Sequence, residues 1–157
     1  MGEVDGLTVQ SYRGASILDV ENIVKRNNLL LYTYDYVILH VGTNDIDNKS
    51  VKQIMQAYKF LFRACKSAAS NATIVFSSIL PRLVDYEDTK NTCINVNTRL
   101  QEFCRKNNLK FVKSYQRFLH AGQPISHLYA RRDGGLHLSF EGTKQLRQCI
   151  INLLSHL

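Results

Sequence analysis

The chain has 157 residues, 45% of them hydrophobic, which is enough for one globular domain with its own core. No apolar run reaches the roughly 20 residues of a membrane-spanning helix, and the first ten residues lack the basic and apolar regions of a signal peptide, so we expect a cytoplasmic protein. The net charge of +7 permits weak contact with nucleic acid or an anionic membrane, but the charges are scattered along the sequence and favour an ordinary solvated surface.

Strand-like and helix-like periods alternate along the chain. Residues 7–11 are predicted to form a short strand, and residues 17–26 a helix with its apolar positions on one face. Residues 34–41 form the next predicted strand. The clearest helix covers 50–69 and begins with a capping box of Ser50 and Gln53. The remaining elements are a strand at 73–80, a helix at 89–107, a strand at 110–114, a loop-like stretch at 115–136 and a helix at 139–157.

This alternation predicts one α/β domain over residues 1–157, with a parallel sheet covered by helices on both faces. In such sheets the ligand binds outside the carboxyl ends of the strands. The polar residues Gly42, Thr43, Asn44 and Asp45 directly follow the predicted strand 34–41. We therefore expect a functional site at that strand end.

Two other segments of the sequence carry polar groups toward the same edge. Gly14 follows the first predicted strand, and Asp133 and His137 precede the last helix. A Gly amide and an Asn side chain can both donate N–H groups to a developing oxyanion. A His can relay the proton while an Asp fixes its tautomer. Gly14, Asn44, Asp133 and His137 are therefore the candidates for an acyl-transfer site.

Three stretches resemble the sequence blocks of the SGNH hydrolases, or GDSL-type esterases: "YRGAS" at 12–16, "GTND" at 42–45 and "DGGLHLSFEG" at 133–142. The amino-acid sequences of the last two stretches are most similar to those of esterase-like domains in the first-open-reading-frame proteins of vertebrate LINE-type retrotransposons. The resemblance implies a three-layer, flavodoxin-like fold and a serine esterase that hydrolyses carboxylic esters, lipids among them, without metal or organic cofactor.

The resemblance also implies a role for each candidate residue. Gly14 and Asn44 would hold the oxyanion, and Gly42 would support the turn together with Asp45. His137 would act as base and then as acid, oriented by the carboxylate of Asp133.

The spacing of that carboxylate departs from the family pattern. Asp133 precedes His137 by four positions rather than three. We favour the interpretation that one extra Gly loops out, because Gly tolerates unusual dihedral angles. The alternative is that Gly134 occupies the position of the acid, and His137 then lacks its support.

The nucleophile block of the family has no counterpart, so no nucleophile is identified. The family's strand ending in Gly-Asp-Ser would lie inside a sheet of order 2-1-3-4-5, and this first strand is absent here. We therefore expect an N-terminally incomplete domain, whether fragment, truncated relic or pseudoenzyme, with little or no activity. The serines that lie near the blocks or strand ends, none of them in a Gly-Asp-Ser context, are Ser11, Ser16, Ser77 and Ser78.

Other interpretations of single residues stay open. Asn44 is also a common turn residue, Asp45 is better explained as a loop hydrogen-bonder, and His40 is better explained by packing within its strand. The four cysteines lack metal-ligand spacing and are interpreted as reduced core thiols, and no metal is implied. The rival function is a non-catalytic module of retroelement origin that binds nucleic acid, membrane or itself. The oligomeric state is open.

Overall fold

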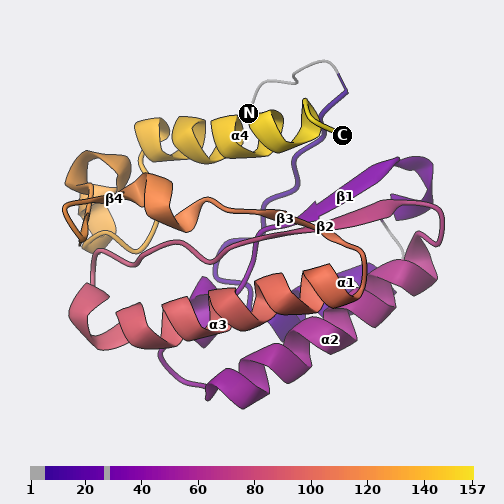
Figure 1. Cartoon of the computed structure of the whole chain (residues 1–157), viewed down its shortest axis with the longest axis horizontal. Coiled ribbons are helices and arrows are strands. Elements are labelled where there is room, and N and C mark those ends of the chain that lie inside the picture. The colour runs from indigo at the N-terminus through magenta and orange to yellow at the C-terminus, as the bar shows by residue number, and fades with distance from the viewer. Residues whose placement is uncertain (1–5, 27–28) are drawn as a thin grey trace.

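The computed structural model describes residues 6–26 and 29–157 and has three layers (Figure 1). Its central sheet is parallel, with strand order β1-β2-β3. The strands are β1 (Tyr36–Leu39), β2 (Thr73–Ser77) and β3 (Lys110–Val112). This arrangement confirms the predicted α/β class with a parallel sheet.

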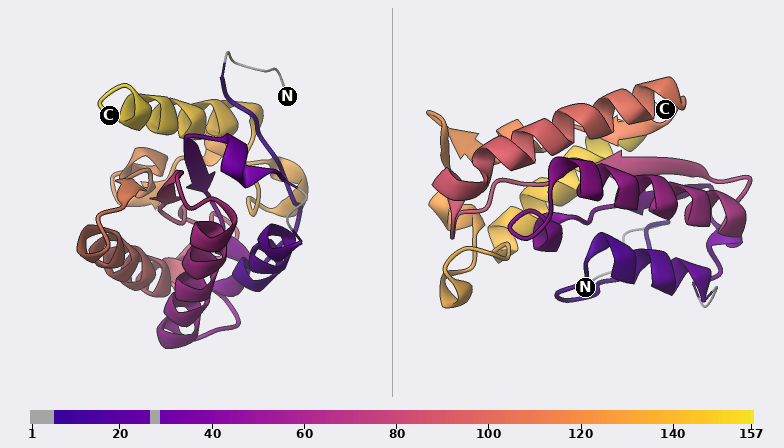
Figure 2. Two further views of the ribbon diagram at one scale, coloured as in Figure 1. Left: turned by 90° about the vertical axis from the view of Figure 1, so that its right-hand side faces the viewer. Right: turned by 90° about the horizontal axis from the view of Figure 1, so that it is seen from below.

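Helices cover both faces of the sheet. The helices α1 (Ile17–Lys25), α2 (Val51–Ala68) and α3 (Tyr86–Lys106) lie on one face, and α4 (Phe140–Leu154) crosses the other (Figures 1 and 2). The four predicted helices are therefore present, with ends that differ by at most three residues from those expected.

Side-chain caps explain where three of the helices begin. Ser16 and Ser50 each accept a hydrogen bond from the backbone N–H three residues on, and the side chains of Asp19 and Gln53 return the contact. Ser139 caps α4 by accepting from the N–H of Gly142. These polar groups satisfy backbone donors that an uncapped helix leaves free.

The predicted strand at 7–11 is wrong. Leu7 takes part in a single β-bridge, and residues 8–12 are irregular and exposed. Apolar and polar residues alternate in that stretch, but its apolar side chains pack against no neighbouring element, since Val9 is 51% exposed. Among the described residues, β1 is therefore an edge strand that pairs only with β2.

The stretch predicted as a loop, 115–136, is more regular than expected. It contains short 3₁₀ turns and a small antiparallel pair, β4 (Leu119–His120) and β5 (Gln123–Pro124). The strand predicted at 73–80 is shorter than expected and ends at Ser77. Both differences lie at the carboxyl end of the sheet, where the chain turns back on itself.

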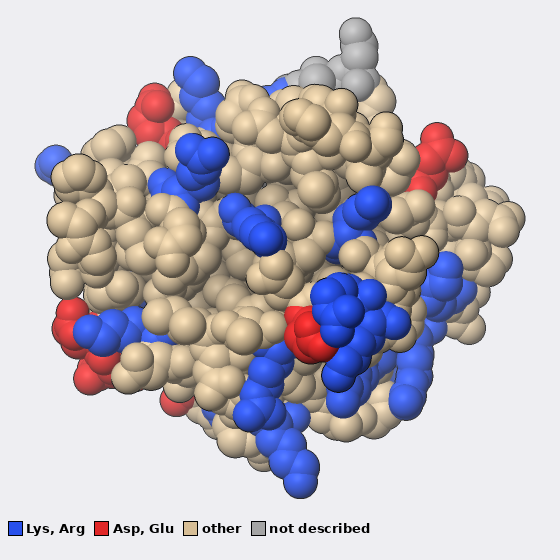
Figure 3. Space-filling model, in the orientation of Figure 1, with Lys and Arg blue, Asp and Glu red and all other residues tan. Residues whose placement is uncertain are grey.

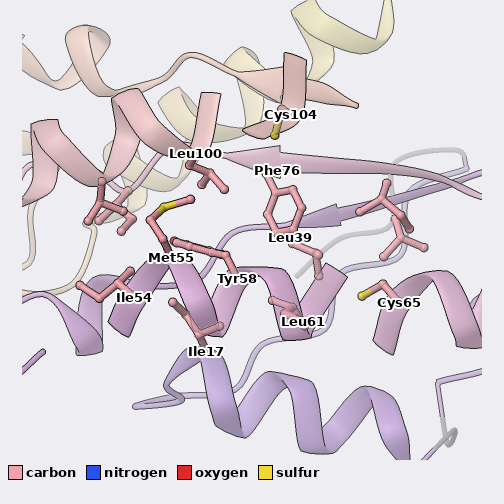
Figure 4. Packing of buried hydrophobic residues seen from close by; sticks show 14 of the residues in the cluster. Ile17, Leu39, Ile54, Met55, Tyr58, Leu61, Cys65, Phe76, Leu100 and Cys104 are labelled. Atoms are coloured by element: carbon pink, nitrogen blue, oxygen red, sulfur yellow. The ribbon is translucent and has the colours of Figure 1, made fainter. Parts of the chain in front are cut away.

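The main core lies between the sheet and α1, α2 and α3 (Figure 4). Tyr58 of α2 meets Phe76 of β2 edge to face, with ring centroids 5.7 Å apart. A smaller cluster at the carboxyl end of the sheet, formed by Leu80, Phe118, Leu128 and Tyr129, supports the loops that lead to α4. The site segments are therefore anchored on two packed clusters.

Candidate functional site

The turn that follows β1 is held in place by α2. Gly42 has a φ of +128°, and a Cβ at this position would lie 2.3 Å from Tyr58 Oη and 2.8 Å from Ile79 Cδ1. The Tyr58 hydroxyl donates to the Val41 carbonyl at 2.5 Å. Only glycine fits this backbone conformation and this space, so the turn geometry depends on Gly42.

Asp45 joins this turn to the start of α1. Its carboxylate is fully buried, accepts the N–H of Ile17 at 3.0 Å and pairs with Lys49. These contacts are structural, because they satisfy a helix N-terminus and neutralise a buried charge.

Asn44 lies beside the segment that carries Gly14. Its Nδ2 donates to the Ala15 carbonyl at 3.0 Å, which occupies one N–H of the amide and leaves the second. Gly14 has a φ of +74°, and its own N–H has no acceptor among the described residues. The fold thus places both predicted oxyanion donors next to each other.

Asp133 and His137 form a hydrogen-bonded pair ahead of α4. The Asp133 Oδ2 and His137 Nδ1 atoms are 2.5 Å apart. Gly134 and Gly135 lie between them with φ values of +72° and +95°, so the extra residue is absorbed by two left-handed backbone conformations. Asp133 Oδ1 also accepts the N–H groups of Gly135 and Leu136, each at 3.1 Å.

These hydrogen bonds determine the charge of the pair. The bond from His137, together with those from the Gly135 and Leu136 N–H groups, lowers the pKa of Asp133 to about 2. The carboxylate is therefore ionised near neutral pH and accepts the proton on Nδ1 of His137, which in a neutral imidazole leaves the lone pair on Nε2. The His137 side chain is 39% exposed, so the imidazole is partly accessible from solvent.

The serine hydroxyls near the strand ends have structural partners. Ser77 is 1% exposed, and its Oγ lies 3.2 Å from Nδ1 of His40. Ser78 and Ser114 are also buried and share a 2.8 Å hydrogen bond. Within residues 6–26 and 29–157, no serine is hydrogen-bonded to His137.

Sequence reasoning missed Arg82, which lies between the turn after β1 and the segment that carries Asp133 and His137. Its guanidinium is buried, donates to the Thr43 carbonyl at 2.5 Å and forms an ion pair with Asp85. The next residue, Leu83, packs against Gly135: a Cβ added to Gly135 would lie 2.6 Å from the Cβ of Leu83. A lone Arg after Pro81 gives no pattern by which the sequence could have revealed this link.

Two features are absent from residues 6–26 and 29–157. It contains no group of three or more His, Cys, Asp or Glu side chains that could hold a metal ion. None of its helices is both long and apolar enough to span a membrane.

A family model for the GDSL-like lipase/acylhydrolase family matches residues 3–145. A comparison with curated protein sequences finds no match.

Solved structures of similar fold include three that differ in origin. A GDSL-like lipase from Bacteroides thetaiotaomicron is 16% identical, with a TM-score of 0.75 over 92% of this chain and 73% of that one. A putative platelet activating factor from Streptococcus pneumonia is 24% identical, with a TM-score of 0.76 over 90% and 69%. The esterase domain of the ORF1 protein from the zebrafish ZfL2-1 retrotransposon is 22% identical, with a TM-score of 0.59 over 92% and 85%. These likenesses show a shared fold.

Proposed function

The chain belongs to the GDSL-like lipase/acylhydrolase family, and from this premise we propose that it carries the base and oxyanion groups of a serine esterase site for carboxylic esters. In this proposal His137 is the base and then the acid, and Asp133 orients it. The Gly14 N–H and the second Asn44 N–H stabilise the oxyanion.

The observation that carries the proposal is the Asp133–His137 pair. A carboxylate 2.5 Å from Nδ1 holds the imidazole in the tautomer whose Nε2 can accept a hydroxyl proton and later return it to the leaving alcohol. The carboxylate also stabilises the imidazolium that forms in between. A purely structural pair would not require the His137 side chain to be partly exposed.

We also propose that the 157 residues alone have little or no turnover. No serine among the described residues contacts His137, and no Gly-Asp-Ser occurs in the sequence. Oxyanion donors and a base without a nucleophile leave only a direct attack by water. Removal of a catalytic serine typically leaves a small residual rate that depends on the oxyanion hole and binding.

A retroelement origin and a cytoplasmic location belong to the same proposal. The fold likeness to the zebrafish retrotransposon domain supports the origin, together with the resemblance of residues 42–45 and 133–142 to esterase-like domains of vertebrate LINE-type retrotransposons. Sequencing the genomic flanks tests it, because dispersed copies followed by a reverse-transcriptase frame are expected. A single copy among unrelated genes would contradict it.

The test begins with the 5′ end of the natural transcript and the reading frame upstream of Met1. If an apolar segment ending in Gly-Asp-Ser is in frame, the longer protein should hydrolyse p-nitrophenyl acetate. H137A should then abolish turnover, and N44A should lower kcat about 100- to 1000-fold. If a stop codon interrupts the frame, the 157-residue chain and H137A should show the same background rate.

Two results would contradict the proposal. A longer, folded protein that contains Gly-Asp-Ser and hydrolyses neither short nor long esters would remove the esterase assignment. Hydrolysis by the 157-residue chain that disappears in H137A would show that a nucleophile is already present. Thermal unfolding of each variant separates loss of activity from loss of structure.

A further inference from the structure

The basic side chains of α2 form a single stripe along the helix. Lys52, Lys59, Arg63 and Lys66 are separated by seven, four and three residues. At 3.6 residues per turn these positions fall within about 60° of the helix circumference and extend over about 21 Å. We call these four residues the α2 stripe.

The α2 stripe has no acidic partner in the described structure. The helix itself contains no Asp or Glu, and none of the four side chains is in an ion pair. On the neighbouring helices, the carboxylate of Glu21 is paired with Lys25 and that of Glu102 with Arg105 and Lys106. Figure 3 shows Lys and Arg side chains gathered over the α2 and α3 region, with little acidic surface among them.

The helix that carries the stripe projects beyond its neighbours. In the end view, α2 lies between α1 and α3 and projects furthest from the sheet (Figure 2, left). A projecting helix lets an extended polyanion follow its length, whereas a flat bilayer would contact the helix along a narrow line only. The shape therefore favours a nucleic-acid chain over a membrane surface.

A groove between α1 and α2 opens beside the stripe. Its volume is about 550 Å³, and its walls combine apolar and amide side chains. Leu18 and Phe60 are 54% and 47% exposed at its rim, and the Arg63 guanidinium lies over the Phe60 ring at 5.7 Å. The other lining residues are Glu21, Lys49, Lys52, Gln53, Gln56 and Ala57.

We propose that α2 binds single-stranded nucleic acid, with the phosphates along the stripe and one base in the groove against Phe60. Lys and Arg supply the affinity for phosphates, and an exposed aromatic ring stacks on unpaired bases of any sequence. The Gln56 amide offers donors and an acceptor to a base edge, and the Gln53 amide, whose oxygen caps α2, offers its N–H groups. At 3.4 Å per nucleotide, the stripe length corresponds to about six nucleotides.

This site uses none of the proposed esterase residues. Its test therefore does not depend on whether the chain hydrolyses esters. A fluorescein-labelled oligouridine of about twelve nucleotides, longer than the stripe, is titrated with the 157-residue chain, and binding is followed by fluorescence anisotropy.

The expected salt dependence follows from the number of cations. Four phosphate contacts on a single strand give a slope of about −2.8 in log K against log salt, so affinity should fall about 50-fold between 50 and 200 mM salt. The variant K52Q/K59Q/R63Q/K66Q should lose this binding. The matched control K110Q/K113Q/K144Q/R147Q has the same net charge and should keep both affinity and slope.

The groove is tested separately with F60A. Loss of one stacked base should weaken binding at least about fivefold with an unchanged salt slope. Unchanged affinity in F60A, with unfolding temperature preserved, would overturn the placement of a base in the groove.

Three other results would overturn the site itself. Equal losses in the stripe and control variants would show that net charge, rather than the stripe, attracts the oligonucleotide. Absence of binding at 50 mM salt would remove the proposal. Binding to vesicles containing about 30% phosphatidylserine, without oligonucleotide binding, would identify the stripe as a membrane contact.

Discussion

Replacing Gly42 by alanine should destabilise the fold by about 2–6 kcal/mol. A φ of +128° is strained for any residue with a Cβ, which costs about 1–3 kcal/mol. The new methyl group would also lie 2.3 Å from Tyr58 Oη and 2.8 Å from Ile79 Cδ1, so buried side chains must move, at a further cost of about 1–3 kcal/mol. Urea unfolding followed by circular dichroism measures the change in the free energy of unfolding.

Gly122 provides the matched control for the backbone term. Its φ is +77°, but a Cβ there would meet nothing within 4 Å, so G122A should show strain without overpacking. The double variant G42A/Y58F removes the hydroxyl nearest the new methyl group and should recover part of the loss. A G42A variant no less stable than G122A would refute the steric account of this turn.

Three further predictions concern other parts of the chain. Because the pKa of Asp133 is held at about 2, the native chain should be more stable than D133N above about pH 4, and this advantage should vanish as the pH falls toward 2. Thermal unfolding of both proteins across that pH range measures the difference. A difference that does not change with pH would contradict the prediction. Burial raises the pKa of three core thiols to about 12, so DTNB at about pH 7.5 should first modify the half-buried Cys149, and C149S should be unreactive until unfolded. Asn97 accepts the N–H of Ile79 at 2.8 Å and donates to its carbonyl at 2.9 Å, so N97A should cost about 2–5 kcal/mol in urea unfolding, and a loss below about 0.5 kcal/mol would contradict this role.

Local signals made the helices predictable and left one strand wrongly assigned. Capping pairs such as Ser50 with Gln53, followed by apolar residues at helical spacing, are properties of the sequence near each helix start. A strand also needs a neighbouring strand, and residues 8–12 have alternating apolar and polar residues but no neighbour on which to pack. Whether a strand finds a partner depends on the tertiary structure, which a short stretch of sequence does not reveal.

The site shows the same division between local and long-range information. The turn after β1 and the Asp133–His137 pair were identified from residue type and order. The contact between Asn44 and Ala15, and the link that Arg82 makes to Thr43, join residues 29 and 39 positions apart. The alignment of the α2 stripe follows from the predicted helix at 50–69, but the lack of acidic partners on the neighbouring elements is a property of the packed structure.

The contacts also separate the residues that the fold requires from those that only chemistry would require. Gly42 fills a position that no side chain fits, and the Asp45 carboxylate satisfies a helix start, so both are needed whether or not an ester is cleaved. The "GTND" turn is therefore weak support for catalysis by itself. His137 differs, because its side chain is partly exposed and its imidazole is hydrogen-bonded to no described residue other than Asp133. A conservative change there should lower the free energy of unfolding by no more than D133N does at the same pH, because it removes only the hydrogen bond to Asp133, while abolishing any serine-dependent turnover. An H137Q variant tests this directly: unfolding in urea together with ester hydrolysis distinguishes a catalytic imidazole from a structural one, and a large loss of stability with turnover retained would reverse the assignment.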